Sequence, residues 1–231
     1  MKNTVMSVGG SLLVPNGIDA EYIGSLKQTL TSYESSHRLF LVAGGGRTAG
    51  QFIEAAEQVR AVAQEDLDWL GIHATRLNAH LLRTVFRESA HPEIITDPTR
   101  RLPVIEPVCI AAGWRPGWST DYVAVQVART YGSNMVINLT NTDYAFDKDP
   151  NKFCDASPLE DITWSEFLTC IPKEWKPRMN APFDPIASRA ASEFGMTVII
   201  ANGANLLNLE HILTGREYVG TTIYPDGKYK K

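Results

Sequence analysis

Short apolar runs alternate with stretches of helical periodicity along most of the chain. Runs of apolar residues that end in glycine or polar residues are typical of buried strands. They predict strands at residues 5–8, 39–42, 104–105, 108–111, 135–139, 197–200 and 220–223. Apolar residues three and four positions apart predict helices over residues 19–33, 48–64, 68–86, 120–131, 185–194 and 205–214. In the helix at 48–64, Phe52, Ile53, Ala56 and Val59 share one face.

Strands that are apolar throughout and alternate with helices indicate a parallel sheet covered on both faces. We therefore predict an α/β fold, a three-layer α/β/α sandwich around a mainly parallel central sheet. The sequence contains no internal repeat and no flexible linker, so residues 1–231 are predicted to form one domain. Its two lobes are expected to divide near residue 130.

Composition and charge exclude several classes of protein. The chain has 22 Lys and Arg against 26 Asp and Glu, and 44% of its 231 residues are hydrophobic, which is ordinary globular usage. A net charge of −4 argues against a nucleic-acid surface, which needs clustered cations. No apolar run approaches the roughly 20 residues that cross a membrane. With three widely spaced cysteines and no signal-peptide pattern, the chain is predicted to be a soluble cytoplasmic protein with reduced thiols.

Glycines follow three of the predicted strands. They are Gly9-Gly10-Ser11, Gly44-Gly45-Gly46-Arg47-Thr48 and the segment from Gly113 to Thr120. In open α/β sheets, ligands bind at the carboxyl ends of the strands, where glycines let backbone N–H groups approach a phosphate closely. One such loop is weak support, since many turns need glycine for packing alone. Three together predict a site that holds several phosphates.

This site is of neither common nucleotide-binding type. The sequence has no G-x-x-x-x-G-K-[ST] motif and no G-x-G-x-x-G motif. No Ser-His-Asp order, paired carboxylates or metal-ligand spacing stands out either.

The loops and their neighbours form an ordered set of motifs along nearly the whole chain. The motifs are Val8-Gly9-Gly10-Ser11-Leu12-Leu13, Gly44-Gly45-Gly46-Arg47-Thr48-Ala49, Gly71-Ile72-His73-Ala74-Thr75-Arg76-Leu77-Asn78-Ala79, Thr140-Asn141-Thr142-Asp143, Asp147-Lys148-Asp149-Pro150 and Phe183-Asp184-Pro185-Ile186-Ala187. This set resembles the amino-acid-kinase superfamily, and within it the archaeal-type uridylate kinases. The resemblance implies that ATP phosphorylates UMP, giving UDP, in a hexameric enzyme.

The resemblance also implies roles for individual residues. ATP would be bound by Ser7, Val8, Gly9, Gly10, Ser11, Gly45, Thr140, Phe146 and Asp149. UMP would be bound by Gly44, Asp68, Trp114, Arg115, Pro116, Gly117, Trp118, Ser119 and Thr120, with Asp68 on the ribose. Catalytic roles fall to Arg47, Asn141 and Arg189. Mg²⁺ would enter with ATP, held mainly by phosphates and water, so no metal-ligating side chain is predicted.

The sequence departs from the family pattern in the second glycine loop and in residues 114–120. We call these residues the acceptor loop, because the resemblance implies that they bind UMP, the phosphoryl acceptor. Gly50 stands where the family has an arginine, and Arg47 is expected to replace that charge. Trp114 and Trp118 replace a histidine and a threonine, which makes the acceptor loop more apolar and able to stack on a base. Ala145 and Phe146 replace a glycine and a tyrosine, and Arg189 replaces a lysine.

These departures leave two alternatives open. One is a kinase of the same fold that acts on another small phosphate or carboxylate. The other is a relative that binds nucleotide for storage or regulation without catalysis.

Arg76 and Asn78 lie in an apolar helical pattern, where packing or a subunit contact is the expected role.

Overall fold

The structure, a computed structural model, describes residues 1–148, 152–172 and 182–227. Its strands are β1 (Lys2–Val8), β2 (His37–Ala43), β3 (Val108–Ala111), β4 (Met135–Thr140), β5 (Ala145–Phe146), β6 (Pro158–Leu159), β7 (Asp161–Thr163), β8 (Thr197–Asn202) and β9 (Thr221–Tyr224). Its helices are α1 (Gly10–Leu13), α2 (Ala20–Thr31), α3 (Gly46–Val59), α4 (Gln64–Val85), α5 (Thr120–Tyr131), α6 (Trp164–Cys170), α7 (Pro185–Glu193) and α8 (Leu206–Thr214).

A seven-stranded sheet with the order β3-β2-β1-β4-β8-β9-β7 forms the middle layer. All neighbours in it are parallel except β8 and β9, which confirms the prediction of a mainly parallel sheet. The central pair, β1 and β4, joins the first half of the chain to the second, with Val8 opposite Leu139. The short strands β5 and β6 form a separate antiparallel pair.

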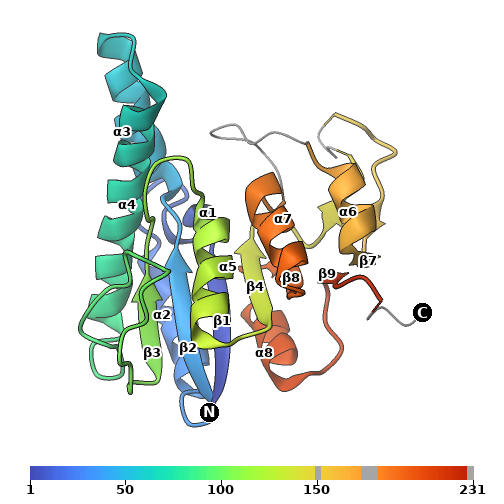
Figure 1. The fold of residues 1–231 in the computed structure, drawn as a ribbon. Coiled ribbons are helices and arrows are strands. Elements are labelled where there is room, and N and C mark those ends of the chain that lie inside the picture. Colours follow the sequence, from blue (N-terminus) through green and yellow to red (C-terminus); the bar gives the residue numbers. More distant parts are fainter. Residues whose placement is uncertain (149–151, 173–181, 228–231) are drawn as a thin grey trace.

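Helices cover both faces of the sheet, so the architecture has the three predicted layers (Figure 1). The alternation of side chains along each strand divides the core in two. Val5 and Phe40 belong to a cluster with residues of α5, α6 and α7. Met6 and Leu41 belong to a second cluster with residues of α2, α4 and α8. Because both faces of β1 and β2 are buried, these strands read as continuous apolar runs.

The structure corrects the sequence-based prediction in several places. Residues 104–105 are not a strand: Pro103 and Pro107 flank them, proline offers no N–H to a strand ladder, and Ile105 is exposed. The helix α6 was not predicted, although its Thr163 and Glu166 form a capping box that the sequence contains. The short α1 and the strands β5, β6 and β7 were also missed, because they are too brief to show a period.

The apolar face predicted for the helix at 48–64 is not a core face. This helix, α3, contains no buried residue, and the side chains of Phe52 and Val59 are 59% and 83% exposed. Its packing partners are α4 and the short α1, and α3 and α4 together rise beyond the body of the molecule (Figure 1). The periodicity therefore identified the helix correctly, but this chain does not bury its apolar stripe.

Candidate phosphoryl-transfer site

Two glycine loops meet at the carboxyl ends of β1 and β2. They touch through their backbones: a Cβ atom on Gly10 would lie 1.9 Å from the backbone nitrogen of Gly46. Gly46 itself has a φ of +59°, which glycine adopts without strain. The contact requires that neither residue carry a side chain. The first two loops predicted from the sequence thus form one surface.

This surface presents backbone donors. The N–H groups of Gly44 and Arg47 bond to Val8 and Val14. Among the described residues, the N–H groups of Gly10, Ser11, Gly45 and Gly46 have no hydrogen-bond acceptor. Unpaired N–H groups at the start of helices favour anions, and phosphate oxygens in particular. We infer that this double loop binds phosphate.

A cavity of about 810 Å³ opens beside the double loop. Ser11, Gly45 and Gly46 line it on the loop side, and Trp118, Ser119 and Thr120 line it from the loop that precedes α5. Apart from Gly113, α3 and α4 supply the rest of the wall, which consists of Ala49, Ile53, Glu57, Gln64, Leu67, Asp68, Gly71, Ile72 and Thr75. A cavity of this size with a few polar groups suits a small-molecule ligand.

Asp68 lies in the wall of this cavity and also holds the neighbouring loop. Its Oδ2 accepts a hydrogen bond of 2.8 Å from the backbone N–H of Gly117. Its Oδ1 accepts one of 2.9 Å from Nε2 of Gln64, one turn earlier on α4. The carboxylate is therefore fixed in direction before any ligand arrives. An ionised carboxylate accepts hydrogen bonds only, so it suits the hydroxyl groups of a sugar.

Further along, α4 binds the backbone of both the Gly113 turn and the second glycine loop. The N–H of Gly113 donates to Oγ1 of Thr75 at 2.8 Å. Arg76 donates to the carbonyls of Gly113 and Trp114. Nδ2 of Asn78 donates to the carbonyls of Gly44 and Gly45. Packing or a subunit contact was the role expected for Arg76 and Asn78, and in the structure their side chains also hydrogen-bond to the two loops.

The acceptor loop is stabilised by an aromatic stack. The ring of Trp118 lies 4.0 Å from Tyr122 and 5.9 Å from Trp114, measured between ring centroids. Arg115 is exposed and places its guanidinium 4.0 Å from the Trp114 ring centroid. None of residues 114–117 is among the described residues that line the cavity. Trp118 both contacts these rings and lines the cavity.

Two carboxylates lie at the starts of α5 and α7; Asp184 is buried and Asp121 is half-buried. Asp121 accepts a hydrogen bond of 3.2 Å from Oγ of Ser7, and its Oδ2 accepts one from the N–H of Asp184. Asp184 caps α7 and accepts a hydrogen bond from Oγ of Ser119. Burial raises the pKa of Asp121 from 3.8 to about 7, and the charge of Asp184 adds to the rise. The pair thus ties β1, α5 and α7 together beneath the site.

These two carboxylates are the residues that sequence reasoning missed. From the sequence, Asp121 has no predicted role, and Asp184 is only part of a motif. They are 63 residues apart in the chain. The sequence signals available were the Ser119 and Asp184 helix caps, which the structure contains, but no spacing rule joins them.

The residues predicted for the ATP side lie along the neighbouring strand ends. Ser7 and Val8 are buried in β1, and Thr140 ends β4 next to Gly9, whose hypothetical Cβ would lie 3.8 Å from the Thr140 Cα. Phe146 is half-buried in β5 and Asn141 is exposed in the turn after β4. Asp149 lies outside the described residues.

Neither of the two arginines predicted to be catalytic is among the described residues that line the cavity. Arg47 does not line the cavity; its Nη1 forms an ion pair of 2.8 Å with Oε1 of Glu54 on the same helix. Gly50 lies beside this pair: a Cβ there would lie 3.5 Å from Nη1, an ordinary van der Waals contact. Arg189 is exposed on α7, the helix that Asp184 caps. The structure thus brings together the glycine loops, Asp68 and the end of the acceptor loop.

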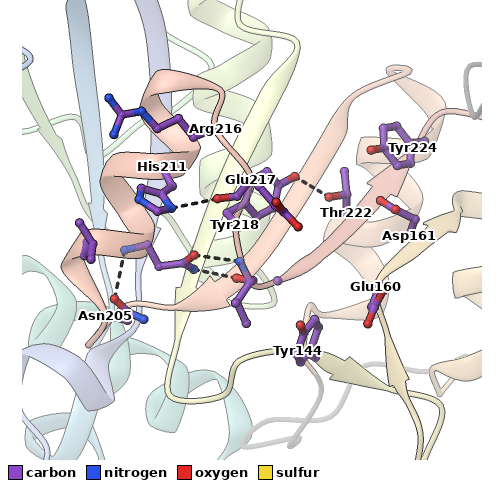
Figure 2. Close-up of a pocket in the computed structure, with 14 residues that line it drawn as sticks. Tyr144, Glu160, Asp161, Asn205, His211, Arg216, Glu217, Tyr218, Thr222 and Tyr224 are labelled. Atoms are coloured by element: carbon purple, nitrogen blue, oxygen red, sulfur yellow. Dashed lines mark hydrogen bonds between the residues drawn. The ribbon is translucent and has the colours of Figure 1, made fainter.

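A second cavity, of about 830 Å³, lies between α8, β9 and β7 (Figure 2). Tyr144, Asp161, Tyr218 and Tyr224 are among its lining residues, and Tyr218 shares a hydrogen bond with Thr222. It contains none of the residues predicted for the site. Within residues 1–148, 152–172 and 182–227, no helix is both long and apolar enough to span a bilayer, and no cluster of three metal-ligating side chains occurs.

Comparison with known proteins agrees with this geometry. The profile of the "Amino acid kinase family" matches residues 2–202. A uridylate kinase of Pyrococcus abyssi is 33% identical over 224 residues, which cover 96% of this chain and 99% of that protein. A uridylate kinase of Methanospirillum hungatei is 34% identical over 231 residues, covering 99% and 97% of the two chains.

Solved structures show the same similarity. The crystal structure of a uridylate kinase from Archaeoglobus fulgidus superposes with a TM-score of 0.83 at 28% identity, covering 96% of this chain and all of that one. That of a UMP kinase from Bacillus anthracis, at 19% identity and a TM-score of 0.77, shares the fold. The chain belongs to the amino acid kinase family, in which these full-length relatives are uridylate kinases.

Proposed function

We propose that this protein transfers the γ-phosphoryl group of ATP to UMP, giving ADP and UDP. The single observation that supports this best is the double glycine loop, which offers four unpaired N–H groups beside a cavity lined by Asp68. The cavity fits a nucleoside monophosphate whose phosphate reaches the loop and whose ribose reaches the carboxylate. Similarity to uridylate kinases over the whole chain favours UMP as the acceptor over the other two alternatives.

The chemistry requires positioning more than covalent help. An oxygen of the UMP phosphate attacks the γ-phosphorus of ATP, and the bond from that phosphorus to the β–γ bridging oxygen breaks, so that ADP leaves. The N–H groups of Gly10, Ser11, Gly45 and Gly46 are proposed to hold the phosphate oxygens in line and to offset their charge. The starts of α5 and α7 point their dipoles toward the same end of the sheet.

ATP is proposed to lie over the ends of β1 and β4, with its nucleoside near Thr140, Phe146 and Asp149. Asn141 and Arg189 are proposed to approach its phosphates from the same side. Arg47 would have to exchange its ion pair with Glu54 for a phosphate. Such an exchange is cheap, because the pair is largely exposed.

Mg²⁺ is proposed to enter as a complex with ATP. When bound, it would neutralise charge on the β- and γ-phosphates. The residues near the loops fit an ion that is carried by the nucleotide, because backbone N–H groups line the site and bind phosphate rather than metal. The carboxylates of Asp121 and Asp184 already accept hydrogen bonds from the chain.

Replacement of Asp68 with alanine tests the proposed UMP site. The variant loses the acceptor for the ribose and the anchor of Gly117, so KM for UMP is expected to rise roughly tenfold to a hundredfold, as for a lost hydrogen bond to a charged group. KM for ATP should stay within about twofold, since binding of ATP does not involve Asp68. Steady-state kinetics with each substrate varied in turn measure both values. Asp66→Ala, two residues earlier on α4 and exposed, is the matched control. An equal rise of both KM values would show that Asp68 does not act on the acceptor.

Oligomeric state, lobes and location are finer proposals. We propose a hexamer, the assembly implied by the resemblance, and the exposed stripe of Phe52 and Val59 on α3 supports association. Light scattering, which measures the molar mass of the assembly, tests the proposed hexamer.

We also propose that residues up to about 130 form the lobe that binds UMP and that the rest form the lobe that binds ATP. A cytoplasmic location is supported by the three unpaired cysteines, and cell fractionation would test it.

The proposed function is tested by a coupled assay of ADP release with Mg-ATP and a panel of acceptors. UMP is expected to be phosphorylated faster than AMP, GMP and small carboxylic acids. Turnover of another acceptor but not of UMP would support the first alternative. Tight ATP binding in calorimetry without any turnover would support a storage or regulatory role.

A further inference from the structure

Asn78 is a buried polar residue whose side chain reaches two consecutive backbone carbonyls. It lies on α4 and is only 4% exposed. Its Nδ2 donates to the carbonyl of Gly44 at 2.8 Å and to that of Gly45 at 3.1 Å. Both carbonyls belong to the second glycine loop, in which Gly45 and Gly46 also line the cavity.

The geometry of the peptide bond turns these two contacts into control of two donors. In a planar trans peptide, the C=O and the following N–H point in opposite directions. Fixing the carbonyl of Gly44 therefore fixes the N–H of Gly45, and fixing the carbonyl of Gly45 fixes the N–H of Gly46. These are two of the four N–H groups that have no acceptor among the described residues.

We propose that Asn78 is a positioning residue for phosphoryl transfer: one side-chain amide aligns two peptide planes, so that the N–H groups of Gly45 and Gly46 face the phosphates. The proposal depends on the function proposed above. Asn78 does not touch the substrate. It acts through the loop, and its effect should appear wherever a phosphate must be held.

Glycine makes such external alignment necessary. Gly44, Gly45 and Gly46 have no side chains to restrict their backbone, and this freedom is what allows the close contact with Gly10. Gly45 is restrained at its carbonyl by Ala49 as well, in the first turn of α3. For the Gly44 carbonyl, Asn78 is the donor that the structure provides. An amide is required there, because a carboxylate would face two carbonyl oxygens without a proton to donate.

The test compares Asn78→Ala with a matched variant, Asn208→Ala, in the full-length protein. Asn208 is also a nearly buried asparagine on a helix, and its Nδ2 donates to the carbonyl of Val219, away from the glycine loops. Three quantities are measured for each: kcat for UMP phosphorylation, the Kd of UMP by calorimetry, and the affinity of uridine, which lacks the phosphate, by competition. Asn78→Asp, which keeps the side-chain volume, is measured in parallel.

For Asn78→Ala and Asn78→Asp, we expect kcat to fall roughly tenfold to a hundredfold, as for a small misplacement of aligned groups. UMP should bind at least about tenfold more weakly while uridine affinity stays within about twofold. Asn208→Ala should leave kcat, the Kd of UMP and the affinity of uridine unchanged. Equal weakening of UMP and uridine, no change in kcat, or failure of both Asn78 variants to fold would overturn the proposal and assign Asn78 to stability. Absence of UMP turnover by the wild-type protein would instead refute the proposed function.

Discussion

Gly10→Ala is expected to lower kcat for UMP phosphorylation by roughly a thousandfold or more. The added methyl group would lie 1.9 Å from the nitrogen of Gly46 and 2.8 Å from that of Gly45, so the two loops must separate. Both contacts are to backbone atoms, which cannot rotate away as a side chain can. Separation moves all four N–H groups that are proposed to bind phosphate. Steady-state kinetics and thermal unfolding of the same preparations provide the measurement.

Gly24→Ala is the matched control for this prediction. Gly24 lies inside α2, and a Cβ there would meet no atom within 4 Å. Alanine should stabilise the helix by roughly 0.5–1 kcal/mol and leave kcat unchanged. A Gly10→Ala variant that folds and retains wild-type activity would contradict the double-loop account.

Asp121→Asn is expected to change how stability depends on pH. Burial and the charge of Asp184 raise the pKa of Asp121 from 3.8 to about 7 in the folded protein. Its protonated form therefore contributes stability that is fully present below pH 3.8 and is lost as the pH rises through about 7. Asparagine never ionises, so the variant should gain stability relative to the wild type over this range, by a few kcal/mol.

The measurement is urea unfolding of both proteins, without nucleotide, at a series of pH values from 4 to 8. The difference in the free energy of unfolding should grow in favour of Asp121→Asn as the pH rises. Asp66→Asn, the same substitution at an exposed position, is measured in parallel as the control. A constant difference for Asp121→Asn would show that its pKa is the same in the folded and unfolded states.

Much of the fold could be predicted because its central strands are buried on both faces. Residues 120–131 match α5 at both ends, since Ser119 caps the helix and Gly132 ends it in the left-handed conformation. Strand direction has no signature in apolar runs, so the antiparallel pairing of β8 and β9 could not be foreseen. The stripe of Phe52 and Val59 shows a different limit: periodicity reveals an apolar face but not what covers it.

The site could be predicted only as far as local motifs reach. Each glycine loop is readable because a loop that binds phosphate through its backbone needs glycine. Other contacts of the site join segments that are distant in the chain. They are the contact between Gly10 and Gly46, the hydrogen bond from Ser7 to Asp121 and the two hydrogen bonds from Asn78 to the second loop. Such contacts depend on how the strands are ordered in the sheet. Trp118 illustrates the same point: the sequence does not show that its ring lies against Tyr122, and its base-stacking role stays a prediction.

The most direct test of the account is a crystal structure of the complex with UMP and a non-hydrolysable ATP analogue. We expect the UMP phosphate and the γ-phosphate to lie within hydrogen-bond distance of the N–H groups of Gly10, Ser11, Gly45 and Gly46, and the ribose to contact Asp68. UMP bound elsewhere, or with its phosphate turned away from the double loop, would contradict the account.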